Sequence, residues 1–192
     1  MEAARSDADL IHASLATPEV FGIVFERHYD VVRRYLQRRS GLEMGEELAA
    51  RTFEEAFRTR GGFNQAYASA RPWLLGIGTN LLRNALRSER VQLRAVARAS
   101  GLRPIGPRGI ERAEERLDAE RHLPALVDAL MTLEDRDRDT LLLFAWNDLT
   151  YDDIAVALDV PVGTVRSRLN RARRQLRELL GPQIAIDGGE DE

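Results

Sequence analysis

Apolar side chains recur at helical spacing along two blocks of this 192-residue sequence, and no such stripe is present between the blocks. Within each block the apolar residues follow one another at intervals of three and four, the period of an amphipathic helix. Breaks at Ser40–Gly41, Gly61–Gly62 and Ser69–Pro72 divide the first block into about four helices. No segment alternates with the period of a strand. The sequence therefore predicts an all-α fold of two small helical domains joined by a flexible linker.

The stretch between the blocks spaces Gly and Pro among arginines, as in ARASGLRPIGPRG. This composition is typical of a flexible linker. A short charged helix is predicted to follow over residues 110–122. The predicted organisation is an N-terminal tail at 1–10, a first domain at 11–92, a linker at 93–120, a second domain at 121–180 and an acidic tail at 181–192.

Composition excludes several classes of function. The chain has no cysteine, which removes disulfides, thiolate metal sites and cysteine nucleophiles. Its histidines, His12, His28 and His122, are scattered without the spacing of metal ligands or of a catalytic triad. We therefore expect no catalytic residues, no metal, no cofactor and no enzymatic activity. No apolar run approaches the roughly 18 residues of a membrane helix, and the N-terminus lacks a signal-peptide core, so a cytoplasmic location without membrane contact is expected.

The second block contains two short helices around a tight turn. Thr150, with Asp153 three residues later, forms a capping-box pattern that predicts a helix start. The run Asp159–Pro161 interrupts that helix, because proline lacks the N–H donor and restricts the residue before it. In the helix that follows, from about Val162, apolar residues fall at i, i+4, i+7 and i+11 and predict one buried stripe: Val165, Leu169, Ala172 and Leu176.

Basic and polar residues occupy the other faces of this last helix. The segment 160–176 has five arginines and no acidic residue, although the whole chain carries a formal net charge of −3. A helix fits the major groove of DNA, arginine pairs bidentately with guanine and asparagine with adenine. The pattern thus predicts a DNA-binding helix-turn-helix. The alternative is a solvated amphipathic helix on a four-helix bundle.

The segment LTYDDIAVALDVPVGTVRSRLNRARRQL (149–176) closely resembles region 4 of bacterial sigma factors, especially the extracytoplasmic-function group. The resemblance implies that this helix reads the −35 promoter element and that its domain contacts the β flap of RNA polymerase. It assigns six residues to DNA contact: Thr164, Arg166, Ser167, Asn170, Arg171 and Arg174.

Two segments of the first block are similar to region 2 of the same family. EELAARTFEEAF (46–57) resembles the surface that docks on the β′ clamp helices of core RNA polymerase, which assigns that contact to Glu46, Glu47, Arg51 and Glu54. The rings of Phe53 and Phe57, at i and i+4, are predicted to pack in the core. Arg51 stands where the family commonly has glutamate.

SARPWLLGIGTNLLRNALRSER (69–90) resembles the region 2 helix that contacts the −10 element, and the loop before it resembles the one that captures a flipped base. Such a base requires an aromatic or apolar wall with polar edges. The resemblance assigns this surface to Asn64, Tyr67, Asn80, Arg83, Asn84 and Arg87. Trp73 is predicted to belong to the core, and Gly76 and Gly78 to allow close helix packing.

The predicted function is that of a sigma factor, which binds core RNA polymerase and directs promoter recognition, DNA melting and transcription initiation. Its partners would be core polymerase and double- and single-stranded promoter DNA, with an anti-sigma factor as a further partner that the family suggests. The alternative is a stand-alone helix-turn-helix repressor or activator, which would act as a dimer on palindromic half-sites.

Overall fold

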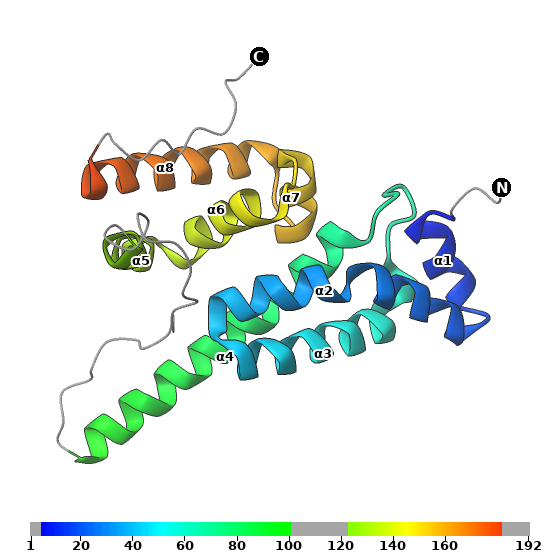
Figure 1. The fold of residues 1–192 in the computed structure, drawn as a ribbon, viewed down its shortest axis with the longest axis horizontal. Coiled ribbons are helices and arrows are strands. Elements are labelled where there is room, and N and C mark those ends of the chain that lie inside the picture. Colours follow the sequence, from blue (N-terminus) through cyan, green and yellow to red (C-terminus); the bar gives the residue numbers. More distant parts are fainter. Residues whose placement is uncertain (1–4, 101–122, 182–192) are drawn as a thin grey trace. The chain divides into compact units, whose positions relative to one another are not determined.

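The computed structural model describes residues 5–100 and 123–181, and every regular element among them is a helix (Figure 1). The chain divides into two compact units, residues 1–111 and 112–192. The all-α fold predicted from the sequence is confirmed. Among the described residues, no helix is long and apolar enough to cross a membrane.

The first unit is a bundle of helices in which each α-helix packs against the next one along the chain. Gly41 ends the second α-helix with a φ of 85°, a conformation that favours glycine, and so reverses the chain where the sequence predicted a break. Figure 1 shows α2 and α3 side by side with α4 across them. The elements are α1 (Asp7–Ser14), η1 (Pro18–Val20), α2 (Phe21–Ser40), α3 (Leu42–Thr59), η2 (Arg60–Gly62) and α4 (Arg71–Ser100).

Small residues let the helices of this unit approach closely. A Cβ atom on Gly45 of α3 would lie 2.5 Å from the Cα of Gln37 in α2, so only glycine fits at this contact. A Cβ atom on Gly78 of α4 would lie 3.2 Å from Thr52 Oγ1 and 3.4 Å from a methyl group of Leu36. The close helix packing predicted at Gly78 is confirmed.

Two predicted boundaries need correction. Residues 1–10 were predicted to form a tail, but α1 begins at Asp7, and both Asp7 and Leu10 are buried. The linker was predicted to begin at residue 93, but α4 continues to Ser100. The reason is local, because residues 93–100 contain helix formers and neither Gly nor Pro before Gly101.

The second unit consists of four helices among its described residues, and α5, α6 and α7 all pack against α8. The helix predicted over 110–122 lies outside the described residues, as does the acidic segment after Gly181. The elements are α5 (Leu123–Thr132), α6 (Asp135–Asn147), α7 (Tyr151–Leu158) and α8 (Val162–Leu180).

Candidate nucleic-acid interface

The turn between α7 and α8 has the geometry that the sequence predicted. The Thr150 hydroxyl accepts a hydrogen bond from the Asp153 amide at 3.1 Å, and the Asp153 carboxylate accepts one from the Thr150 amide at 3.1 Å, which completes a capping box. Asp159 ends α7 in the left-handed conformation with a φ of 52°. Pro161 precedes the first residue of α8. These features confirm a helix-turn-helix.

The buried stripe of α8 consists of the four predicted residues, Val165, Leu169, Ala172 and Leu176, each no more than 1% exposed. Leu169 and its neighbours pack against α6 and α7 and so fix which side of α8 faces outward. The side chains predicted to face outward are all exposed: Arg166, Ser167, Asn170, Arg171 and Arg174. Thr164 is half-buried, and its carbonyl oxygen accepts a hydrogen bond from the Ser167 hydroxyl at 3.0 Å.

Arg171 differs from the other outward residues, because it is paired within the unit. Its Nε donates to Asp137 Oδ2 at 2.5 Å and its Nη2 donates to Asp137 Oδ1 at 2.8 Å. The Asp137 side chain on α6 is 1% exposed, whereas that of Arg171 is 48% exposed. The hydrogen bonds and the charge of Asp137 raise the pKa of Arg171 above its ordinary value. Sequence analysis found Arg171 but missed its partner.

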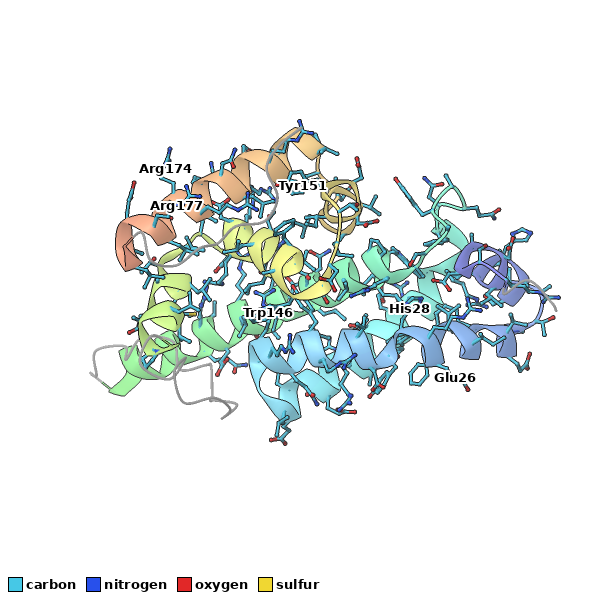
Figure 2. The ribbon with its side chains drawn as sticks, turned by 45° about the horizontal axis from the view of Figure 1, so that its top comes forward. Glu26, His28, Trp146, Tyr151, Arg174 and Arg177 are labelled. Atoms are coloured by element: carbon cyan, nitrogen blue, oxygen red, sulfur yellow. The ribbon has the colours of Figure 1, made fainter. Side chains whose placement is uncertain are left out.

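The arginines beyond Arg171 fall into two kinds. Arg174 and Arg177 are exposed and lie further along α8, where Figure 2 labels them. Arg173 is half-buried instead, and its guanidinium lies 5.2 Å from the centre of the Phe144 ring. This side chain therefore packs toward α6 through a cation–π contact, and Arg173 does not belong to the exposed arginine surface.

A second polar surface lies on α4 of the first unit. Asn80 and Asn84 are exposed and, at i and i+4, share one face of the helix. Arg83 is half-buried, and its Nη1 lies 3.4 Å from the Asn80 side-chain oxygen. Arg87, one turn beyond Arg83, is exposed. The structure thus brings these four predicted residues together on one side of α4.

The loop between η2 and α4, residues 63–70, lies in the same unit and carries the other predicted base-contacting residues. The Asn64 side-chain oxygen accepts a hydrogen bond from the Ala66 amide at 3.0 Å, which shapes the loop. The Tyr67 side chain is exposed. Phe63 is buried and its ring centre lies 5.1 Å from that of Trp73. Trp73 itself is half-buried, so the prediction that it belongs to the core holds only in part.

Asp7 of α1 is the residue that sequence reasoning missed. Its Oδ2 accepts hydrogen bonds from His28 Nε2 at 2.6 Å and from the Ala70 amide at 2.9 Å. Its Oδ1 accepts one from Arg27 Nη1 at 2.9 Å. Burial would raise the pKa of Asp7, but these hydrogen bonds and the charge of His28 outweigh it and lower the pKa from 3.8 to about 2.

A signal for this helix was present in the sequence. Ser6 and Asp9 form the same capping-box pattern that was recognised at Thr150, and the structure contains that box. The partners of Asp7 could not have been found in this way, because they lie 20 to 63 residues away along the chain.

The residues predicted to contact polymerase lie on α3. Glu46, Glu47, Arg51 and Glu54 are all exposed. Glu47 and Arg51 form an ion pair at 3.7 Å on this surface. Glu46 is instead tied to α2, where the Tyr29 hydroxyl donates to its Oε1 at 2.6 Å; this hydrogen bond, with burial, raises the pKa of Tyr29.

The two phenylalanines of α3 differ in burial. Phe53 is 4% exposed and packs edge-on against Phe25, which confirms its predicted place in the core. Phe57 is 37% exposed, so its predicted core position is wrong. Its ring lies at the end of α3, with the edge of Phe21 on one side and the Arg60 guanidinium 3.8 Å from its centre.

Among the described residues no cluster of His, Asp and Glu has the arrangement of a metal site.

Comparison with known proteins covers both units. The family model for sigma-70 region 2 matches residues 24–91, and the one for sigma-70 region 4 matches residues 123–176. The chain is 30% identical over 165 residues to RNA polymerase sigma factor CarQ of Myxococcus xanthus, which covers 85% of this chain and 90% of that protein. It is 32% identical over 151 residues to ECF RNA polymerase sigma factor SigC of Mycobacterium tuberculosis, covering 76% of this chain and 75% of that protein.

A solved sigma-factor structure is also similar to this chain. The sigma factor RpoE of Bartonella quintana, solved in complex with the anti-sigma factor NepR, is similar with a TM-score of 0.61 and 26% identity, over 86% of this chain and 99% of that chain. A stand-alone helix-turn-helix regulator would share only the second unit with these proteins, whereas the region 2 match lies entirely in the first. This chain therefore belongs to the sigma-70 family and is an extracytoplasmic-function sigma factor, which directs RNA polymerase to promoters.

Proposed function

We propose that the chain holds two promoter elements at once while it is bound to core polymerase. The outer face of α8 reads the −35 element as duplex DNA. The loop 63–70 and the polar face of α4 bind the −10 element, the loop receiving a base that has left the stack. The α3 surface docks on the β′ clamp helices, and the second unit contacts the β flap.

The observation that carries the −35 assignment is the division of α8 into a buried apolar stripe and an exposed polar face. Arg166 and Asn170 lie on that face, and the side chains of both are exposed. Their donors are therefore available for base edges, to which arginine and asparagine can each bind bidentately.

The −10 assignment is supported by the kinds of side chain that the loop and α4 expose. Tyr67 offers a ring for stacking, and Asn80 and Asn84 offer amide groups that bind base edges. Arg87 adds a positive charge that is suited to the backbone phosphate. Proteins that bind single-stranded DNA generally combine aromatic stacking with positive charge in this way.

Tethering to polymerase explains how a chain with a formal net charge of −3 can bind DNA. A domain that makes few phosphate contacts loses much of its DNA affinity at physiological salt. Two weak domains on one polymerase act at a high effective concentration, so neither needs to bind DNA tightly alone. The proposed role is that of a specificity factor without catalytic activity, acting in the cytoplasm. Because RpoE of Bartonella quintana was solved with an anti-sigma factor, we include a protein inhibitor of that kind among the proposed partners.

Polymerase docking is tested by charge reversal on α3. Glu54→Arg in the full chain should lower affinity for core polymerase by roughly tenfold in a titration, since reversing a charge at a docking surface removes its electrostatic complementarity to the partner. Glu26→Arg, which reverses an exposed charge on α2 (Figure 2), is the matched control and should bind as the wild type does. Equal binding by both variants would remove α3 from the docking surface. Gel filtration gives a second test. A chain that elutes as a dimer and does not bind core polymerase would contradict the whole proposal.

A further inference from the structure

The loop 63–70 is fastened at its C-terminal end by a single residue of α1. The Asp7 amide donates to the Ala68 carbonyl oxygen at 3.1 Å, and the Asp7 carboxylate accepts from the Ala70 amide at 2.9 Å. Two backbone groups on either side of Ser69 are therefore bound to one residue. This attachment sets the path of the chain immediately before α4 begins at Arg71.

The Asp7 carboxylate is itself held rigidly. Arg27 and His28 of α2 donate to its two oxygens at 2.9 and 2.6 Å, and the Asp7 side chain is 7% exposed. Figure 2 labels His28 at its position on α2. Charge-assisted hydrogen bonds of this kind are shorter and roughly twice as strong as neutral ones. The cluster links α1, α2 and the loop, because Asp7 lies on α1, Arg27 and His28 are neighbours on α2, and the Ala70 amide belongs to the loop.

Two further contacts support the loop away from this end. Gln65 Nε2 lies 2.9 Å from His12 Nδ1, again a residue of α1. At the N-terminal end Phe63 is buried against Trp73. Residues 64–67, between the two anchored ends, are all exposed. The loop is thus fixed at both ends and presents its middle to the surface.

We infer that Asp7 is a positioning residue for −10 recognition, which holds the loop in the shape that receives the unstacked base although Asp7 does not touch DNA. This inference rests on the proposed function of the loop. A base pocket must keep its aromatic side chain and its polar groups at fixed positions. A loop that is free at one end would let these side chains adopt many different positions. Asp7 supplies that fixation from a helix outside the predicted contact surface.

The test uses the full chain with core polymerase and a promoter carrying 2-aminopurine at the base of the −10 element that becomes unstacked, because its fluorescence rises on unstacking. Asp7→Ala should lower the fluorescence change and the preference among the four bases at that position by roughly three- to tenfold, with polymerase binding unchanged. Ser6→Ala is the matched control, since it removes the cap of α1 but no contact with the loop. It should behave as the wild type does. A base preference that is the same in Asp7→Ala as in Ser6→Ala would overturn the inference.

A second pair of variants covers the case in which Asp7→Ala does not fold. His28→Ala removes one donor to Asp7, whereas His28→Gln keeps an N–H group that can reach the same oxygen. His28→Ala should weaken the base preference and His28→Gln should restore most of it, a rescue that a general loss of stability would not give. Wild-type base preference in both would again overturn the inference.

Loop variants separate this inference from the proposed function. Asn64→Ala and Tyr67→Ala alter the residues that the loop presents. If they leave the fluorescence change and base preference intact, the proposed role of the loop is wrong and the inference falls with it. If they reduce both while Asp7→Ala does not, the loop keeps its proposed role and only the inference about Asp7 is wrong.

Discussion

The guanidinium of Arg171 on α8 donates two hydrogen bonds to the buried carboxylate of Asp137 on α6, at 2.5 and 2.8 Å. The pair joins the recognition helix to the helix that supports it. An arginine side chain has five N–H donors, and this pair engages Nε and one hydrogen of Nη2. The remaining donors are left for the proposed contact with DNA, on a side chain that Asp137 restrains.

Substitution of Asp137 should therefore exchange sequence specificity for general DNA affinity. In Asp137→Asn the positive charge of Arg171 is no longer compensated and its side chain is less restrained. We expect tighter binding of the full chain to unrelated duplex DNA at low salt, with the slope of log affinity against log salt steeper by about 1. The ratio of −35 duplex to unrelated duplex affinity should fall. Anisotropy titrations over a salt series measure both quantities.

Arg171 and Arg166, both exposed on α8, should differ in their effect on stability. Arg171→Ala leaves a buried carboxylate unpaired and should lower the free energy of unfolding of the second unit by about 3 kcal/mol. Arg166→Ala removes an exposed arginine and should change it by less than about 0.5 kcal/mol. Urea unfolding of both variants gives the comparison. Equal losses of unfolding free energy in the two variants would mean that the pair between Arg171 and Asp137 does not stabilise the second unit.

The residues that the sequence could place are those defined by local spacing. The stripe from Val165 to Leu176 and the capping box at Thr150 depend on intervals of a few residues, so the helical period and cap chemistry suffice to find them. Asp137 lies 34 residues from Arg171, and nothing in the spacing of either residue indicates the other. Long-range polar pairs of this kind depend on how helices pack, which the local spacing of residues does not reveal.

The misplaced N-terminal boundary and the exposure of Phe57 also depend on tertiary contacts. Residues 1–10 were assigned to a tail because they are polar, yet Asp7 is buried once Arg27, His28 and the Ala70 amide satisfy its carboxylate. Phe57 has the spacing of a core residue but lies where α3 ends, so fewer neighbours cover it. Composition predicts average burial, whereas individual burial depends on tertiary partners.

Acid should remove the contribution of Asp7 to stability in a defined pH range. Since the folded-state pKa is about 2 and the ordinary value is 3.8, the charged cluster stabilises the fold above about pH 4 and loses this effect as the pH falls toward 2. The difference corresponds to about 2 kcal/mol. In Asp7→Asn this contribution is missing at every pH. The gap in unfolding free energy between wild type and Asp7→Asn should thus be widest above pH 4 and narrow below it, as measured by urea unfolding at stepwise pH; a gap independent of pH would contradict the assignment.

Close packing at Gly45 should make it intolerant of even one methyl group. In Gly45→Ala the new Cβ would meet the backbone of Gln37 at 2.5 Å, so α2 and α3 must separate. We expect a loss of about 2 kcal/mol or more in the unfolding free energy of the first unit. A Trp146→Phe background leaves Trp73 as the fluorescent reporter of that unit.

Gly22→Ala is the matched control for this prediction. Nothing lies within 4 Å of a Cβ atom at Gly22, which is also helical. Its stability should be unchanged or raised by up to about 1 kcal/mol. A Gly45→Ala protein as stable as Gly22→Ala would show that α2 and α3 are not in close contact at this point.

Promoter selection by the reconstituted holoenzyme tests the central claim most directly. Core polymerase with the full chain would transcribe a template library randomised over the −35 and −10 elements, and sequencing of transcribed templates gives the base preference at every position. We predict two blocks of preference for the wild type, and loss of the upstream block alone in Arg166→Ala/Asn170→Ala. Arg136→Ala, which removes an exposed arginine from α6, should retain both blocks. An upstream preference unchanged in the Arg166→Ala/Asn170→Ala variant would contradict the assignment of α8 to the −35 element.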